Sequence, residues 1–399
     1  MFPRWQGDAT PAFVLNSAKD IATFGHDVRV IAPHFPHGPL DSNEAGISVR
    51  RYRYAWPSKL ETLCYEGGML VRLRQSPFKK ALLPLFAISQ YLVTKQELRR
   101  YQPDIVHAHS LLPQGWLAAK ALGRNRSIPL VVSTHGNDVF GLQGRYMKLK
   151  RQTAKRADMI IANSRATLRR VNEFCSSEKL TIIPASPNEA SLRPSRKTRD
   201  ANEGPVILFA GRLIPEKGVE LLLDIFPAVR EQIPSAKLVI CGDGPLANTV
   251  RTTLARWKSP QNATYLGWIP NELIIEQFAQ ADLAIVPSQP QPGGWEEAQG
   301  LVAVEAMSAG AIVVASRIGG LAESIIHGET GFLVEPNDRK EWTRTIISTL
   351  RAPAGQQALW KDNARRRYLT EFSREASAKK TLTLYQSLDA QRAAPSPPQ

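Results

Sequence analysis

Residues 293–310 read GGWEEAQGLVAVEAMSAG and place two glutamates, Glu297 and Glu305, eight positions apart. Glycines and polar residues precede an Ala/Val/Leu run that starts near Gly300, which is the pattern of a loop leading into a buried helix. Eight helical residues make about 2.2 turns, so we expect Glu305 on the helix wall and Glu297 in the loop at its entrance. Two carboxylates above the N–H groups of a helix N-terminus suit a ligand that combines hydroxyl groups with phosphate, as a nucleotide sugar does.

The wider pattern around these glutamates carries a family resemblance. Taken alone, two glutamates would indicate a surface pair beside a core helix. The motif Glu-x7-Glu followed by Ala-Met-x-x-Gly resembles the donor-site signature of the family 4 retaining glycosyltransferases, which have the GT-B fold. The resemblance implies an α/β protein with two Rossmann-like domains that face each other across a cleft. It also implies that Glu305 binds the ribose hydroxyls, that Glu297 orients the sugar, and that the amides near Gly300 and Leu301 hold the diphosphate.

Length and composition set limits on the class of protein. A chain of 399 residues is long enough for two domains, and 43% hydrophobic with 22% charged residues is typical of a soluble globular protein. No apolar run approaches the roughly 18 residues that a membrane-spanning helix needs. Polar residues within positions 3–8 interrupt any signal-peptide core, and three isolated cysteines argue against a disulfide framework or a zinc site. A reducing cytoplasm fits this cysteine content. Neither a metal nor a cofactor is expected.

The positive charge is concentrated in one half of the chain. The net charge is +15, and residues 1–200 alone contain 31 Lys and Arg against 15 Asp and Glu. Such asymmetry predicts an anionic partner for the first half, which could be a membrane lipid, a nucleic acid or a phosphorylated substrate. We find no nucleic-acid-binding signature, and the aromatic residues do not follow the basic runs. No nucleic-acid partner is therefore expected.

Residues 68–100 favour the membrane among these partners. Basic side chains there alternate with apolar ones, as in segments that lie at the surface of an anionic leaflet, and Pro77 and Pro84 exclude one continuous helix. Core helices with solvated basic faces explain the same pattern equally well. The protein would then lie in the cytoplasm, either free or at the inner face of the cytoplasmic membrane.

Short β-branched runs alternate with helical patterns in both halves of the chain. We expect strands at 27–33, 104–109, 130–135, 159–164, 180–184, 206–210, 237–241, 283–286, 311–315 and 331–334. The predicted organisation is an N-terminal acceptor-side domain at 1–185, a polar linker at 186–204, a donor domain at 205–365, a helix at 366–392 that packs back on the N-terminal domain, and a disordered tail at 393–399.

One departure from the family concerns the start of the sequence. In relatives a strand precedes the segment that resembles residues 1–8, whereas this sequence begins just after the position where that strand would end. The first strand of a doubly wound sheet is usually central. We therefore expect a chain that starts at Met1 to be less stable than one extended upstream.

A second loop supplies cations for a diphosphate. Residues 211–218, GRLIPEKG, follow a predicted strand. The planar guanidinium of Arg212 can bind two phosphate oxygens, and the ammonium of Lys217 adds a point charge. Without context this would be a plain turn. Its position 85 residues before Glu297 resembles the family spacing, which implies that Gly211, Arg212 and Lys217 contact the donor.

Two further motifs of the second half are less specific. Residues 241–247, CGDGPLA, imitate a dinucleotide fingerprint, but no acidic residue follows about 20 positions on at a strand end, so a nicotinamide dehydrogenase is the poorer account. The resemblance implies a structural turn there. It also implies that backbone amides near Trp268 recognise the base. A role of Trp268 in packing would explain this tryptophan equally well.

Histidines and one loop of the first half complete the predicted site. His135 ends a strand and so points toward the ligand edge of its sheet, where the resemblance places it beside the donor sugar. His107 and His109 lie on one face of a strand, and two histidines without a carboxylate cluster make a poor metal site. His109 either lines the acceptor side or packs. Gly7 and Asp8 belong to the loop that, by resemblance, closes over phosphate and acceptor.

These features predict a metal-independent retaining hexosyltransferase that moves a sugar from a nucleotide-diphosphate sugar to a glycan or lipid-linked acceptor. His135, Arg212, Lys217 and Glu297 would carry catalysis. Two alternatives remain, which are a nucleotide-sugar epimerase of GT-B fold and a non-catalytic protein whose basic half binds membrane or nucleic acid. The sequence leaves open the base, the sugar, the acceptor, the linkage and the oligomeric state.

Overall fold

The computed structural model describes residues 2–5, 8, 12–65, 69, 72–73, 76–185, 187, 204–257, 260–291, 294 and 296–393. The chain divides into two compact units. Unit 1 comprises residues 1–163, 167–186 and 374–399, and unit 2 comprises residues 164–166 and 187–373. Most of the predicted linker and all but the first residue of the predicted tail lie outside the described residues.

Unit 1 contains two separate sheets. One has the order β1-β3-β2, with β1 (Arg29–Pro33) parallel and β2 (Asp41–Glu44) antiparallel to β3 (Ile47–Tyr52). The other is the parallel sheet β4 (Val106–His109), β5 (Leu130–Ser133), β6 (Met159–Ala162) and β7 (Leu180–Ile182). The parallel strands begin and end within two residues of the predicted bounds, and β5 is buried at every position, as parallel strands between helices usually are.

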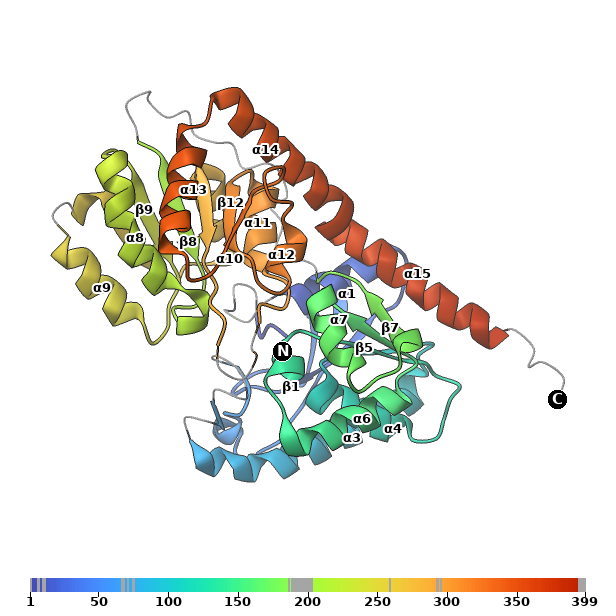
Figure 1. Ribbon diagram of the computed structural model, residues 1–399. Helices are drawn as coiled ribbons and strands as arrows, with labels where there is room; N and C mark the ends of the chain where they lie inside the picture. Colours follow the sequence, from blue (N-terminus) through green and yellow to red (C-terminus); the bar gives the residue numbers. More distant parts are fainter. Residues whose placement is uncertain are drawn as a thin grey trace. The chain divides into compact units, whose positions relative to one another are not determined.

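The helices of unit 1 flank these sheets (Figure 1). They are α1 (Phe13–Thr23), α3 (Leu82–Tyr101), α4 (Trp116–Leu122), α5 (Asn137–Phe140), α6 (Met147–Arg156), α7 (Arg165–Asn172), whose first two residues belong to unit 2, and α15 (Arg374–Ala393). α3 begins after Pro77, whereas Pro84 lies in its first turn, where its missing N–H would have no helical partner anyway. α15 packs on α1, and the Arg374 guanidinium forms an ion pair with Asp20.

The sequence did not predict β2 and β3, and a buried arginine explains why. Arg51 of β3 is 1% exposed and donates to the Pro3 carbonyl from Nη2 at 2.7 Å and to the Pro33 carbonyl from Nη1 at 3.3 Å. A charged side chain inside a strand breaks the apolar pattern by which strands are recognised. The polar strand β2 gives no such pattern either.

Unit 2 is a single parallel sheet with the order β10-β9-β8-β11-β12-β13. Its strands are β8 (Val206–Ala210), β9 (Lys237–Cys241), β10 (Ala263–Gly267), β11 (Leu283–Val286), β12 (Ile312–Ser316) and β13 (Phe332–Val334). β9 and β10 follow one another outward on one side of β8, and β11, β12 and β13 follow one another outward on its other side. The direction of the strand order therefore reverses between β8 and β11. Ligands of open α/β sheets bind at such a switch point, beyond the carboxyl ends of the strands.

Helices cover both faces of this sheet (Figure 1). α8 (Val219–Gln232), α9 (Ala247–Arg256) and α13 (Arg339–Arg351) contribute to one core, and α10 (Asn271–Gln280), α11 (Leu301–Ala309), α12 (Leu321–Ser324) and α14 (Ala354–Arg367) contribute to the other. A π-helical turn, Tyr368–Phe372, follows α14, and the extended residue Ser373 (ψ 156°) separates it from α15. The α/β class with Rossmann-like units is thus confirmed. Across the described residues, no helix combines the length and apolarity needed to cross a membrane.

Candidate functional site

Two loops of unit 2 meet at the switch point. Residues 211–218 follow β8 and residues 287–300 follow β11, and the amide of Gln289 donates to the Glu216 carbonyl at 2.9 Å. Gly218 has φ +69°, and a Cβ at this position would lie 1.8 Å from the Pro287 carbonyl oxygen. A glycine is therefore required where the two loops touch.

This contact brings together two of the residues predicted from sequence. Lys217 ends the 3₁₀ turn Pro215–Lys217, and its Nζ donates to Oε2 of Glu297 at 2.5 Å. The same carboxylate oxygen accepts from the Ser288 hydroxyl at 3.1 Å, and Glu297 is only 9% exposed. Sequence reasoning missed Ser288, whose only signal is its place two residues beyond the end of β11. The outcome is a largely buried ion pair at the carboxyl edge of the sheet, where open α/β sheets usually bind ligands.

The helix that follows Glu297 begins as predicted. Gly300 precedes α11 with φ +73°, and a Cβ there would lie 2.3 Å from Leu321 Cδ2. Glu305 is half-buried on the wall of α11, between the buried residues Val304 and Ala306. No side chain from the described part of the chain caps the helix. Its first amides can therefore donate to an anion.

Neighbouring loops hold this arrangement in place. The amide of Gly320 donates to the Glu297 carbonyl at 2.7 Å, which fixes the backbone of the glutamate loop. On the other side, the amide of Gly211 donates to the Cys241 carbonyl at 3.0 Å, and that of Leu213 donates to the Asp243 carbonyl at 2.9 Å. The glycine-rich loop after β9 thus supports the loop that carries Lys217.

Two other predicted donor residues are exposed. The Arg212 side chain makes no hydrogen bond or ion pair with any residue that the structure describes, and Trp268 is 51% exposed. The structure therefore pairs Lys217 with Glu297 and leaves Arg212, in the same loop as Lys217, exposed.

In unit 1 three imidazoles form a stack. The ring centroids of His107 and His109 lie 4.5 Å apart, and those of His109 and His135 lie 5.4 Å apart, with Nδ1 of His109 3.2 Å from Nε2 of His135. His107 is held at both nitrogens, by the Tyr385 hydroxyl at 2.6 Å and the Ser133 hydroxyl at 2.7 Å. The period-two placement of His107 and His109 on one face of β4 is as predicted.

Burial keeps these imidazoles neutral. It lowers the pKa of His107 to about 4 and that of His135 to about 3, and together with the neighbouring imidazoles it lowers the pKa of His109 well below the usual value. A neutral His135 can donate one hydrogen bond to a ligand without carrying charge. Tyr385 and Ser133, which hold the far end of the stack, had no role in the sequence prediction.

The loop predicted to close over the acceptor is described only in part, since Gly7 lies outside the described residues. Asp8 is described, and its carboxylate accepts from Arg4 Nη2 at 2.7 Å and from Arg4 Nε at 3.0 Å. This paired fork holds both ends of the segment 4–8 together.

Comparisons with known proteins agree with this geometry. A family model described as "Glycosyltransferase Family 4" matches residues 12–186, and one described as "Glycosyl transferases group 1" matches residues 193–367. The chain belongs to glycosyltransferase family 4. It is therefore a glycosyltransferase of GT-B type, and its two Rossmann-like units are those of that fold.

The chain is similar to two sequence relatives and to one solved structure of the same fold. Glycogen synthase from Mycobacterium tuberculosis is 27% identical over 299 residues, 72% of this chain and 69% of that protein. A GDP-mannose-dependent phosphatidylinositol monomannoside mannosyltransferase from Mycolicibacterium smegmatis is 29% identical over 255 residues, 61% and 66% of the two chains. Anabaena HepE, solved with UDP and glucose, has a TM-score of 0.69 and 22% identity over 96% of this chain and 98% of that one.

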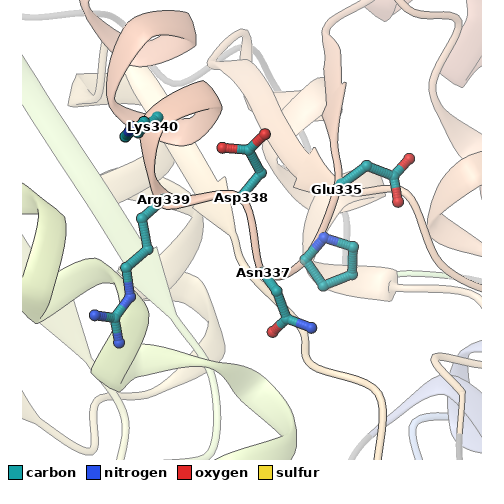
Figure 2. Close-up of a pocket in the computed structure, with 6 residues that line it drawn as sticks. Glu335, Asn337, Asp338, Arg339 and Lys340 are labelled. Atoms are coloured by element: carbon teal, nitrogen blue, oxygen red, sulfur yellow. The ribbon is translucent and has the colours of Figure 1, made fainter.

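A separate hollow of about 600 Å³ in the glycosyltransferase lies over residues 335–340, between β13 and α13 (Figure 2). Its charged side chains diverge, because Glu335 pairs with Arg317 at 3.1 Å and Arg339 pairs with Asp224 at 2.7 Å. Nothing converges on a common ligand there. Among the described residues no cluster of His, Cys, Asp and Glu is arranged to hold a metal ion.

Proposed function

We propose that this glycosyltransferase moves a sugar, with retention at the anomeric carbon, from a nucleoside-diphosphate sugar to a glycan or lipid-linked acceptor. The observation that carries the proposal is the Lys217–Glu297 pair at the entrance to α11. The pair lies at the switch point of the sheet, beside a helix N-terminus that can bind an anion.

The donor would lie across these groups in a defined order. Glu305 on the wall of α11 accepts hydrogen bonds from the ribose hydroxyls. The α11 amides, Lys217 and Arg212 bind the diphosphate, and Glu297 accepts from the sugar hydroxyls with the oxygen that its two protein donors leave free. His135 is proposed as a donor to the sugar on the family resemblance alone, and its neutral imidazole can donate one hydrogen bond. The relatives use different bases, as the names with GDP and UDP show, so the base stays open.

In the proposed reaction, negative charge develops on the departing phosphate. The bond between the anomeric carbon and the phosphate oxygen breaks, and the acceptor hydroxyl attacks the same face while its proton passes to the departing phosphate. Arg212, Lys217 and the helix amides stabilise the charge on that phosphate, so these residues can do the work of a divalent cation. Neither glutamate serves as a nucleophile, because a retaining glycosidase needs carboxylates on both sides of the bond, about 5 Å apart, whereas both glutamates here lie on the donor side.

A thermal-shift screen of nucleoside diphosphates and their sugars, without metal, tests the donor site. Ligand at 100 times its Kd stabilises the folded state by about 2.7 kcal/mol. We expect one nucleotide family to raise the melting temperature of the wild type but not that of Glu305→Ala. The matched control is Glu276→Ala, an exposed glutamate on α10, which should respond like the wild type. No shift with any nucleotide from a folded protein would contradict the proposal.

Product analysis separates the transferase from the epimerase. With donor but no acceptor, a GT-B epimerase converts its sugar, whereas the proposed transferase should leave donor unchanged apart from slow hydrolysis. Turnover of donor to an isomeric sugar in the absence of acceptor would replace the transferase proposal.

We further infer that α3 lies on an anionic membrane while the enzyme works on a lipid-linked acceptor. Leu85, Ile88 and Leu92 share one face of α3 and are 52%, 56% and 56% exposed, and Phe78 just before the helix is 88% exposed. The opposite face, with Phe86, Gln90 and Thr94, is buried. Exposed Lys80 and the terminal residues Arg99 and Arg100 add positive charge to the same segment. Apolar side chains flanked by cations match the interface of an anionic leaflet.

Vesicle flotation tests this surface. We expect the protein to bind vesicles that contain anionic lipid, with affinity that falls as salt rises, and the variant Phe78→Asp with Ile88→Asp to lose most binding. Leu359→Asp, a change at a 51%-exposed apolar residue of α14, is the control. Equal flotation of the α3 variant and the control would refute the membrane assignment.

The stacked imidazoles predict a dependence of stability on pH. Their folded pKa values lie below the unfolded value of about 6.5, so the unfolded state binds more protons between about pH 6.5 and pH 4. The free energy of unfolding should therefore fall as the pH drops through that range. We expect the fall in melting temperature between pH 7 and pH 5 to be smaller in His107→Asn than in the wild type. His26→Asn, which changes an exposed histidine, should keep the full drop.

A further inference from the structure

Two of the three imidazoles in unit 1 meet nitrogen to nitrogen. His109 is the last residue of β4, and His135 lies two residues beyond the end of β5. Their rings are nearly parallel, at 10°, with centroids 5.4 Å apart, whereas Nδ1 of His109 lies 3.2 Å from Nε2 of His135. The centroids are thus farther apart than the nitrogens by about the sum of the two centroid-to-nitrogen distances. The nitrogens therefore face each other along the line between the centroids, which is the geometry of a hydrogen bond in the plane of both rings.

The position of the proton on one ring decides its position on the other. Burial lowers the pKa of both imidazoles, so each ring is neutral near pH 7. A neutral imidazole has one N–H donor and one acceptor nitrogen. In the contact one ring donates and the other accepts. The tautomers of His109 and His135 are therefore linked.

A buried carboxylate holds the backbone of both histidine-bearing segments. Asp138 is 5% exposed, and its Oδ1 accepts from the His135 amide at 3.0 Å. Its Oδ2 accepts from the amide of Leu111, two residues after His109, at 2.7 Å. The strand ladder adds to this link, since His109 is the register partner of Ser133. The contact between the two rings is therefore set by the backbone of unit 1.

The same contact leaves Nδ1 of His135 as the nitrogen that can serve a ligand. Nε2 faces His109, and Nδ1 has no hydrogen-bond partner within the described ranges of the chain. Phe13 of α1 packs on the ring, with centroids 4.7 Å apart, which restricts its rotation. For Nδ1 to donate a proton to a hydroxyl group, Nε2 must accept one from His109.

We propose that His109 is a positioning residue that fixes the tautomer of His135. The Nδ1–H of His109 donates to Nε2 of His135, so the proton of His135 lies on Nδ1 and can be donated to a sugar hydroxyl. The direction of this hydrogen bond rests on the proposed function, in which His135 is a donor to the sugar. His109 thus acts through His135 and need not touch the substrate itself.

Nitrogen-15 NMR of the histidine side chains tests the tautomer in the ligand-free protein. The chain has seven histidines, and the signals of His135 are those lost in His135→Gln. We expect the Nδ1–H tautomer of His135 in the wild type and in His109→Asn, whose side-chain amide can donate from nearly the place of Nδ1. In His109→Leu, which cannot donate, His135 should shift toward the Nε2–H form that predominates in free neutral histidine.

His107→Asn is the matched control for the tautomer. His107 lies against His109, but its own nitrogens bond to Tyr385 and Ser133, so its loss should leave His135 in the Nδ1–H form. An Nε2–H tautomer of His135 in the wild type would overturn the proposal, whether or not the protein transfers sugar. An Nδ1–H tautomer that persists in His109→Leu would overturn it as well.

Kinetics distinguish positioning from packing. We expect kcat/KM to fall about tenfold or more in His109→Leu, comparable with the loss of an outer partner that orients a ligating histidine. His109→Asn should restore most of that loss, with melting temperatures showing that both variants are folded. A packing role predicts the reverse order, because leucine fills an apolar site better than asparagine. Failure of the wild type to transfer sugar from any nucleotide sugar would refute the proposed function and leave the NMR result unchanged.

Discussion

Arg212→Ala should lower kcat by about 10²-fold or more, the loss typical of removing a major charge-stabilising donor. Arg212 follows β8 in the loop that carries Lys217, and its guanidinium is exposed with no partner among the described residues. It can therefore turn to the diphosphate as charge develops on it, and the guanidinium fork can bind two phosphate oxygens at once. The measurement is steady-state turnover of the nucleotide sugar with acceptor.

The pattern of the loss tests the assigned role of Arg212. A group that acts chiefly in the transition state lowers kcat and kcat/KM together, whereas one that only binds substrate raises KM. Lys237→Ala is the matched control, because Lys237 is an exposed cation at the opposite end of the neighbouring strand β9. Normal turnover of Arg212→Ala would remove Arg212 from the catalytic machinery.

The parallel strands could be predicted because each is short, apolar and bounded by a turn signal. β8, β9 and β11 have the bounds expected from sequence alone. β3 could not be predicted, since the contacts that make a buried Arg51 tolerable come from Pro3 and Pro33, which are remote in sequence.

Local sequence patterns predict one part of the site, and contacts between residues distant in sequence form the other part. The positions of Gly300, Leu301 and Glu305 at the start of α11 follow from a local pattern, a glycine before an apolar helix. The contact between Lys217 and Glu297 depends on β8 and β11 being neighbours, which strand order decides and sequence spacing does not. Tyr385 reaches His107 from the end of the chain, 278 positions away, and no local pattern predicts it.

Glu297→Gln should lower kcat/KM by about 10²-fold, comparable with the loss of one catalytic hydrogen-bonding group. Glutamine keeps the size of the side chain but removes the charge that the Lys217 ammonium and the Ser288 hydroxyl now contact. The sugar hydroxyls, the Lys217 ammonium and the Ser288 hydroxyl each lose a charged acceptor. Glu296→Gln, a change at the exposed neighbouring residue, should leave turnover unchanged.

Binding of the free nucleoside diphosphate distinguishes this role of Glu297 from a structural one. Without the carboxylate, the charge of Lys217 is no longer neutralised within the protein, so it attracts the diphosphate more strongly. We therefore expect the Kd for the nucleoside diphosphate to stay equal or decrease in Glu297→Gln while turnover falls. A structural role would weaken both together, because the loops after β8 and β11 would separate. Adding Lys217→Met should then weaken diphosphate binding in the variant and in the wild type, with a coupling between the two changes that a double-mutant cycle measures.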